Sequence, residues 1–224
     1  MRYTAEQWIP TSGHSQQLRS TEILPLRGVF EHGMVCTLLL ISGSLREGSI
    51  NTSVLRTVQA GICGEIDSML YEDLGSVPPF NPDHDVEPLH PAVRRVRDLV
   101  HRADAILFST PEYAGTIPGS LKNLLEWMIG DAHQGSIYQK PVAWINASPR
   151  GATKAHESLR TVLDYANALV VEDACIHVPV VRASIGSDGL VSDSGDRDQL
   201  QRAARTLCQR ACRSSPERRI GYPY

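Results

Sequence analysis

Residues 35–52 read VCTLLLISGSLREGSINT, a pattern from which the rest of the fold can be inferred. Its first seven residues are a short apolar run, as expected of a strand that is buried on both faces of a parallel sheet. A loop of serines and glycines follows and leads into residues 51–63, where Val54, Leu55 and Val58 recur at helical spacing. The stretch therefore predicts a strand, a polar loop and a helix in direct succession.

The same alternation of strand and helix continues along the chain. Strands are predicted at residues 35–41, 65–71, 103–109, 141–146 and 170–178, and helices at 51–63, 90–102, 118–129, 152–168 and 196–212. Helices between consecutive strands imply right-handed crossovers and a parallel sheet covered on both faces. We predict an α/β fold, a flavodoxin-like three-layer sandwich with a five-stranded parallel sheet in the order 2-1-3-4-5. Ligands of such sheets bind at the carboxyl ends of the strands, at the switch point between strands 1 and 3.

Composition narrows the class of protein. The 224 residues carry a formal net charge of −3, which argues against a nucleic-acid-binding surface. No apolar run approaches the roughly 20 residues that span a bilayer, and the N-terminal region lacks the continuous apolar stretch of a signal peptide. We expect a flavodoxin-like domain at 34–212, an N-terminal extension at 1–33 and a loose tail at 213–224. The protein is expected to be soluble and cytoplasmic, with no membrane partner.

Cysteine and histidine spacing gives no sign of a disulfide framework or a metal site. The five cysteines are scattered, and their odd number fits a reducing compartment. Cys208 and Cys212 lie four residues apart on a predicted helix, where packing or surface positions are their expected roles. The eight histidines show no metal-binding spacing, so no metal is expected.

The loop after the first strand has the composition of a phosphate site. A helix N-terminus offers unpaired N–H groups and a partial positive charge. Gly43 and Gly48 allow close turns, and Arg46 adds a cation with paired donors. Short polar side chains complete the set: Ser44, Ser49, Asn51 and Thr52. One terminal monophosphate is therefore the expected ligand.

Other interpretations of this loop can be compared with it. A P-loop requires a lysine that is absent here, and a dinucleotide loop requires the spacing GxGxxG, where this chain has serine and arginine at the crowded positions. Ser49 or Asn51 acting only as a helix N-cap is a further alternative. A cap would account for one polar residue, but not for five together with an arginine.

These residues resemble the opening signature of the NADPH-dependent FMN reductase family, which includes FMN, quinone, azo-dye and chromate reductases. The resemblance continues in residues 110–123, TPEYAGTIPGSLKN, and spans roughly residues 35–212. It implies that the FMN phosphate is bound by Ser44, Arg46, Ser49, Ile50 and Asn51. It also implies that the isoalloxazine ring is lined by Pro111, Glu112, Tyr113 and Ala114. Ser148 and Arg150, in the loop after the fourth strand, are further expected cofactor contacts.

The sequence departs from the family pattern in two places. Ala114 stands where the family often has asparagine, which removes one side-chain hydrogen bond. The loop at residues 148–154, SPRGATK, lacks the usual run of glycines. Three roles are open for Arg150 there: a cation near the N1/O2 side of the ring, a ligand of the NADPH 2′-phosphate, or a side chain that points into water.

The resemblance implies an enzyme in which the flavin carries the chemistry. Electrons would pass from NADPH or NADH through FMN to a small acceptor such as a flavin or a quinone. No residue resembles a nucleophile with its base, so no catalytic side chain is predicted, and Glu112 is expected to have a backbone or surface role rather than that of an acid. The alternatives are a flavodoxin-type FMN electron carrier and a flavinless binding member of the fold. A homodimer or homotetramer is implied by the resemblance alone.

Overall fold

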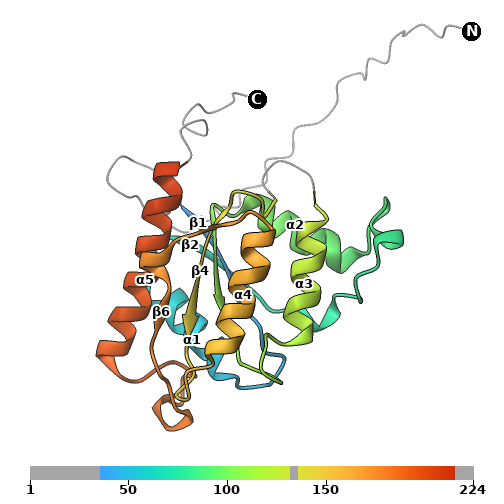
Figure 1. The fold of residues 1–224 in the computed structure, drawn as a ribbon. Coiled ribbons are helices and arrows are strands. Elements are labelled where there is room, and N and C mark those ends of the chain that lie inside the picture. The colour runs from blue at the N-terminus through green and yellow to red at the C-terminus, as the bar shows by residue number, and fades with distance from the viewer. Residues whose placement is uncertain (1–35, 132–135, 215–224) are drawn as a thin grey trace, which may run out of the picture.

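The computed structural model describes residues 36–131 and 136–214, and a parallel sheet forms its centre (Figure 1). The strands are β1 (Thr37–Ser42), β2 (Asp67–Tyr71), β3 (Ala105–Ser109), β4 (Pro141–Asn146), β5 (Leu169–Val170) and β6 (Ile176–His177). Their order is β2-β1-β3-β4-β5, with β6 also paired to β4, and every pairing is parallel. The predicted fold class and strand order are confirmed.

The prediction of one continuous strand at residues 170–178 is wrong. The structure divides it into β5 and β6, separated by a 3-10 turn at Glu172–Ala174. Val170 pairs with Val142, and Ile176 pairs with Ile145. Between these two pairs, this segment therefore contains more residues than β4 does. The surplus residues leave the sheet, exposing Glu172 and burying the Ala174 side chain in the core. Two adjacent acidic residues do not suit a continuous buried strand.

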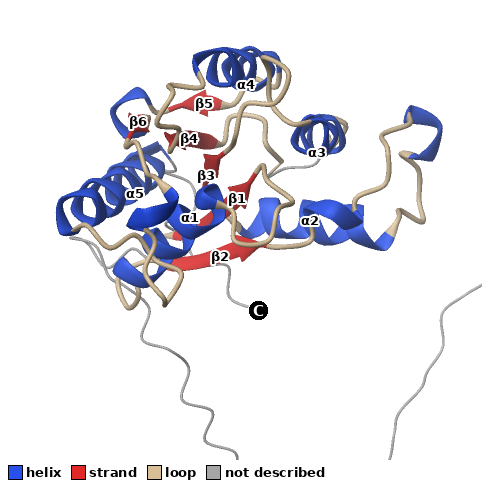
Figure 2. Ribbon diagram, turned by 90° about the horizontal axis from the view of Figure 1, so that it is seen from below, coloured by secondary structure: helices blue, strands red, loops and turns tan. Residues whose placement is uncertain are grey.

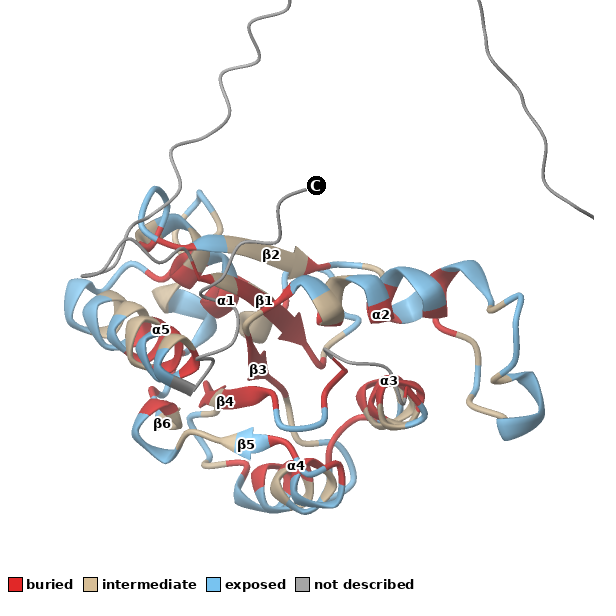
Figure 3. Ribbon diagram, turned by 90° about the horizontal axis from the view of Figure 1, so that it is seen from above, coloured by how far each residue is buried: buried red, intermediate tan, exposed pale blue. Residues whose placement is uncertain are grey.

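Helices cover both faces of the sheet (Figures 2 and 3). They are α1 (Ile50–Gly61) and α5 (Ser194–Ser214) on one face, and α2 (Pro91–Arg102), α3 (Gly119–Ile129) and α4 (Thr153–Tyr165) on the other. Strand β1 shows why both faces need a cover: Leu38 and Leu40 pack towards α1 and α5, whereas Leu39 and Ile41 pack towards α2, α3 and α4. None of the helices in the described ranges is long and apolar enough to cross a membrane.

Capping residues explain two of the helix boundaries that differ from the prediction. Helix α4 ends at Tyr165 rather than at residue 168, since Asn167 adopts a positive φ of 52° and the Ala168 N–H donates back to the Leu163 carbonyl at 3.0 Å. Helix α5 begins at Ser194 rather than at residue 196, and the Asp193 carboxylate accepts from the Asp196 N–H at 2.8 Å. Helix α5 also includes the first two residues of the predicted tail; the remaining tail and the extension at 1–33 lie outside the described residues.

The connection from β2 to α2 extends away from the body of the sandwich (Figure 2) and is held by α3. The Asn123 side chain accepts from the Phe80 N–H at 2.7 Å and donates to the Pro78 carbonyl at 2.9 Å. The Trp127 indole N–H donates to the same carbonyl at 2.8 Å. Asn123 therefore fixes a turn. In α3 itself, Lys122 forms an ion pair with Glu126.

Candidate functional site

A cavity of about 510 Å³ opens at the carboxyl ends of the central strands. The loops after β1, β3 and β4 form its walls, and this is the switch point between β1 and β3 where α/β sheets bind ligands. Ten of the eleven predicted site residues line it: Ser44, Arg46, Ser49, Ile50, Asn51, Pro111, Glu112, Tyr113, Ser148 and Arg150. Ala114 is outside the lining, and so is Thr52 of the predicted phosphate set, whose hydroxyl donates to the Ser42 hydroxyl. The structure thus brings together three loops that are far apart in the sequence.

Hydroxyl groups at the strand end shape the first loop, residues 43–49. The Ser42 hydroxyl accepts from the Thr52 hydroxyl at 2.9 Å and from the Ser44 N–H at 3.3 Å. The Ser44 hydroxyl in turn accepts from the Arg46 N–H at 3.3 Å. Gly43 is confined, because an added Cβ would lie 2.3 Å from Oγ1 of Thr110. The loop is therefore packed directly against the end of β3.

The N-terminus of α1 faces this loop without a side-chain cap in the described structure. Ser49 is the N-cap residue, with an extended backbone, and makes no capping hydrogen bond. The Asn51 side chain is engaged elsewhere, since its Oδ1 accepts from the Ser109 hydroxyl at 3.0 Å. The first turn contains no acidic residue. Neither side chain caps the helix, so capping does not explain the polar residues of this loop. The helix end retains its capacity to bind an anion.

The second loop, residues 110–117, contains a tight hairpin turn. Tyr113 and Thr116 exchange backbone hydrogen bonds of 3.0 and 3.1 Å. The two residues between them have positive φ angles, 51° at Ala114 and 75° at Gly115, as in a type I′ turn. Asparagine tolerates this conformation better than alanine does. Ala114 thus occupies a turn position beside the cavity, while Tyr113, a residue that is 45% exposed, lines its wall.

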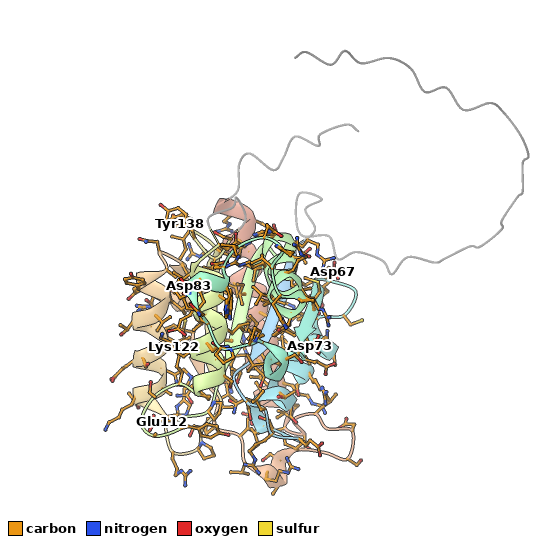
Figure 4. All side chains as sticks on the ribbon, turned by 90° about the vertical axis from the view of Figure 1, so that its right-hand side faces the viewer. Asp67, Asp73, Asp83, Glu112, Lys122 and Tyr138 are labelled. Carbon is orange, nitrogen blue, oxygen red and sulfur yellow. The ribbon has the colours of Figure 1, made fainter. Side chains whose placement is uncertain are left out.

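Glu112 links the second loop to α4. Its carboxylate accepts from the Ala155 N–H in the first turn of α4 at 3.1 Å. The helix has no cap of its own, because Ala152 at its N-cap position is left-handed and has no polar side chain. A carboxylate at a helix N-terminus also interacts favourably with the helix dipole. Figure 4 shows Glu112 at the lower end of the molecule. Its hydrogen bond to α4 supports a structural role rather than that of an acid.

The third loop, residues 147–152, is closed by hydrogen bonds of its own. The Ser148 N–H donates to the Asn146 side chain at 3.1 Å, and the Gly151 N–H donates to the Ser148 carbonyl at 3.1 Å. Positive φ angles occur at Gly151 (92°) and Ala152 (45°). The chain therefore keeps a left-handed bend at Ala152 without a glycine, at a cost of about 1–2 kcal/mol.

Arginine is the only cationic residue type in the described lining. Arg46 and Arg150 were predicted, whereas Arg182 was missed. None of the three lies within ion-pair distance of a carboxylate among residues 36–131 and 136–214. Glu47 belongs to the first loop but lines a second pocket beside this cavity, not the cavity itself. Gly48, predicted as a turn residue of the phosphate loop, also lines the cavity, and four further lining residues were missed: Thr110, Ala147, Pro149 and Ala152. All lie in the predicted loops, and all except Thr110 are nonpolar.

A buried histidine lies behind the third loop. Burial lowers the pKa of His156, and His177 adds to this effect, while the Ala152 carbonyl and Glu112 act against it. Its Nδ1 lies 2.8 Å from that carbonyl, and its Nε2 has no partner within the described part of the chain. His156 does not line the cavity. The described residues also hold no group of three or more His, Cys, Asp or Glu side chains that could bind a metal ion.

The arrangement is suited to one terminal phosphate and an attached flat ring. The phosphate end offers helix amides, hydroxyls and guanidinium groups, which are strong anion donors. The ring end offers irregular backbone and the Tyr113 surface. The described lining contains no histidine, cysteine or lysine that could act as a nucleophile or base. The site offers groups that can bind and orient a cofactor.

Comparison with known proteins agrees with this geometry. Residues 36–181 match the family described as NADPH-dependent FMN reductase. An NAD(P)H-dependent FMN reductase of Pseudomonas aeruginosa is 30% identical over 169 residues, 75% of this chain and 90% of the relative. A quinone reductase of Pseudomonas putida is 30% identical over 163 residues, 72% of this chain and 84% of the relative.

A solved structure is similar over nearly its whole length. It is a flavoenzyme NAD(P)H:(acceptor) oxidoreductase of Paracoccus denitrificans, with a TM-score of 0.70 and 26% identity, and the match covers 80% of this chain and 98% of that one. The resemblance inferred from the two loop motifs is confirmed. This chain belongs to the NADPH-dependent FMN reductase family of oxidoreductases.

Proposed function

We propose that this chain binds FMN in the cavity and transfers electrons from NAD(P)H to a small acceptor of the quinone or flavin class. The observation that carries the proposal is the uncapped N-terminus of α1, which faces a cavity with arginines that have no carboxylate partner among the described residues. The reductase activities of the relatives from Pseudomonas support the electron donor and the acceptor class.

The first loop would hold the phosphate of FMN. Backbone N–H groups at Ile50 and Asn51 belong to the first turn of α1, and Ser44 and Ser49 add hydroxyl groups. Arg46 adds a charge-assisted contact. The Ser109 hydroxyl fixes the Asn51 side chain from the end of β3. This donor set fits a terminal phosphate.

The second and third loops would hold the isoalloxazine ring. Pro111, Tyr113 and Ser148 line the cavity where two parallel strands end. We assign Glu112 to holding this wall against α4 and Ala114 to forming the turn. When bound, FMN supplies the redox chemistry, so the protein has only to position the ring and leave one face accessible.

Experiment can distinguish the three possible roles of Arg150 at the ring end. Its side chain is exposed, lines the cavity and has no carboxylate partner among the described residues. If Arg150 binds the 2′-phosphate of NADPH, Arg150→Ala raises KM for NADPH and leaves KM for NADH unchanged. If it lies at the N1/O2 side of the ring, the same variant lowers the flavin reduction potential and affects both donors. If the Arg150 side chain points into water, Arg150→Ala changes neither the KM values nor the flavin reduction potential.

A spectrum of the purified protein and an anaerobic titration with NADPH test the proposal. We expect the absorbance bands of bound flavin, their loss on addition of NADPH, and their return when a quinone is added. A colourless protein that shows no FMN-dependent thermal shift would instead support a flavinless member of the fold. Bound flavin that NADPH fails to reduce would support an electron carrier.

Two further features belong to the proposal. We propose a cytoplasmic location, since the five cysteines all lie in the described part of the chain and all are free. We propose a homodimer or homotetramer on the basis of family resemblance. Light scattering coupled to size-exclusion chromatography measures the mass of the assembly directly, and a mass of one chain, 24.6 kDa, would contradict the oligomer.

A further inference from the structure

A segment outside the three loop motifs reaches the phosphate end of the cavity. It runs from the end of β6 to the start of α5 and is fixed at both ends. The Val180 N–H donates to the Ala147 carbonyl at 3.0 Å, beside β4. The Val191 N–H donates to the buried Thr57 hydroxyl of α1 at 2.9 Å. The segment is therefore held in register with the helix whose N-terminus faces the cavity.

Arg182 is the residue through which this segment contacts the first loop. Its Nη1 donates to the Gly48 carbonyl, and its side chain lines the cavity. Gly48 has a φ of 59°, and an added Cβ would lie only 2.8 Å from Nη2 of Arg182. A glycine at position 48 thus allows the guanidinium to approach the loop backbone closely. Residue 182 is also one position beyond the stretch that matches the family.

The charges at this end of the cavity leave room for a second cation. A phosphate monoester carries about −1.5 to −2 charges near neutral pH. Arg46 and the N-terminus of α1, worth about half a charge, together supply about +1.5, which falls short of the upper end of this range. A guanidinium has five N–H donors, and the one described hydrogen bond of Arg182 uses a single Nη1 donor. The remaining donors are sufficient for a phosphate.

We propose that Arg182 is a second phosphate-binding residue, which holds the first loop through Gly48 and contacts the phosphate of FMN. Arg182 would then determine the preference of the site for FMN over riboflavin, which has the same ring and no phosphate. The inference rests on the proposed function, because it requires FMN in this cavity.

Affinities for FMN and riboflavin, measured by flavin fluorescence titration of the flavin-free protein, test the inference. For Arg182→Ala we expect FMN binding to weaken about 10-fold, as for loss of a partly exposed charge-assisted contact, and riboflavin binding to change less than about 2-fold by the same argument. Arg182→Lys retains the charge but not the paired donors, so its FMN affinity is expected to fall in between. Arg202→Ala is the matched control, since Arg202 is exposed on α5 and does not line the cavity.

The possible outcomes separate the inference from the proposed function. If Arg182→Ala weakens FMN and riboflavin binding equally, Arg182 only supports the loop, and the phosphate contact is refuted. An unchanged FMN affinity in the variant also refutes it. If the unaltered protein binds neither flavin, or binds both equally, the FMN site itself is wrong. If the variant fails to fold, as judged by circular dichroism, the intermediate affinity of Arg182→Lys decides the question.

Discussion

The phosphate end and the ring end of the cavity are built in different ways. The first loop is shaped by hydroxyl groups within a few residues of it, such as Ser42 and Ser44, and by the close packing of Gly43. The ring end depends on contacts between distant segments, above all the Glu112 carboxylate at the start of α4. The phosphate end is therefore built around one short motif that packs against the end of β3, whereas at the ring end a side chain of one loop caps a separate helix.

The largest effect is expected from Gly43→Ala, which attacks the local motif. The added methyl group would lie 2.3 Å from the Thr110 hydroxyl and 2.8 Å from its Cβ, so the loop or β3 must shift. We expect a loss of measurable FMN binding and a decrease of about 1–3 kcal/mol in the free energy of unfolding, as for overpacking. Urea unfolding and FMN titration measure both quantities. Gly119→Ala, where nothing lies within 4 Å of the added Cβ, is the control.

A smaller loss is expected from Arg46→Ala, which leaves the loop backbone intact. Removal of a charge-assisted hydrogen bond of about 1.5–3 kcal/mol predicts FMN binding that is about 10- to 100-fold weaker. Isothermal titration with FMN measures the change, and Arg202→Ala again serves as the control. Unchanged affinity would mean that the phosphate lies elsewhere.

At the ring end, Glu112→Ala tests the contact between loops. Loss of the cap on α4 should lower the free energy of unfolding by about 0.5–2 kcal/mol. Glu112→Gln keeps an oxygen acceptor at this position and should lose less. Because Glu112 is engaged with the helix, we expect the pH profile of kcat to keep its shape in Glu112→Gln. A profile that loses an ionisation would instead make Glu112 an acid.

The smallest effect concerns His156, behind the third loop. Burial lowers its pKa in the folded state below the ordinary 6.5, so the unfolded chain binds the proton more readily. The contribution of His156 to stability is therefore present above pH 6.5 and is lost as the pH falls towards the lower folded-state value. Unfolding experiments from pH 7.5 to 5 should show a weaker pH dependence in His156→Leu than in the unaltered protein. His84→Asn, at an exposed position in the connection from β2 to α2, is the control; equal slopes in all three would refute the assignment.

Local patterns were sufficient to predict much of this molecule. The alternation of apolar runs and helical spacing gave the strand order, and the serine- and glycine-rich loop gave the phosphate end. The break between β5 and β6 was missed, although Glu172 and Asp173 were a signal against a continuous buried strand. Asn167, likewise, was a signal for the earlier end of α4.

Long-range contacts could not be predicted in the same way. Arg182 contacts Gly48 across 134 positions of sequence, and Glu112 contacts Ala155 across 43. Neither residue stands in a pattern that names its partner, because the contact arises only when the sheet brings the ends of its strands together. Ala114 illustrates the opposite limit: it lies in the expected motif, yet its place in the turn puts it outside the cavity lining.

A crystal structure of the protein with FMN would show directly where the phosphate binds. We predict that the phosphate lies at the N-terminus of α1, within hydrogen-bonding distance of the first-loop amides and of Arg46, with the ring against Tyr113. An FMN molecule whose phosphate faces solvent, or whose ring occupies the first loop, would contradict it.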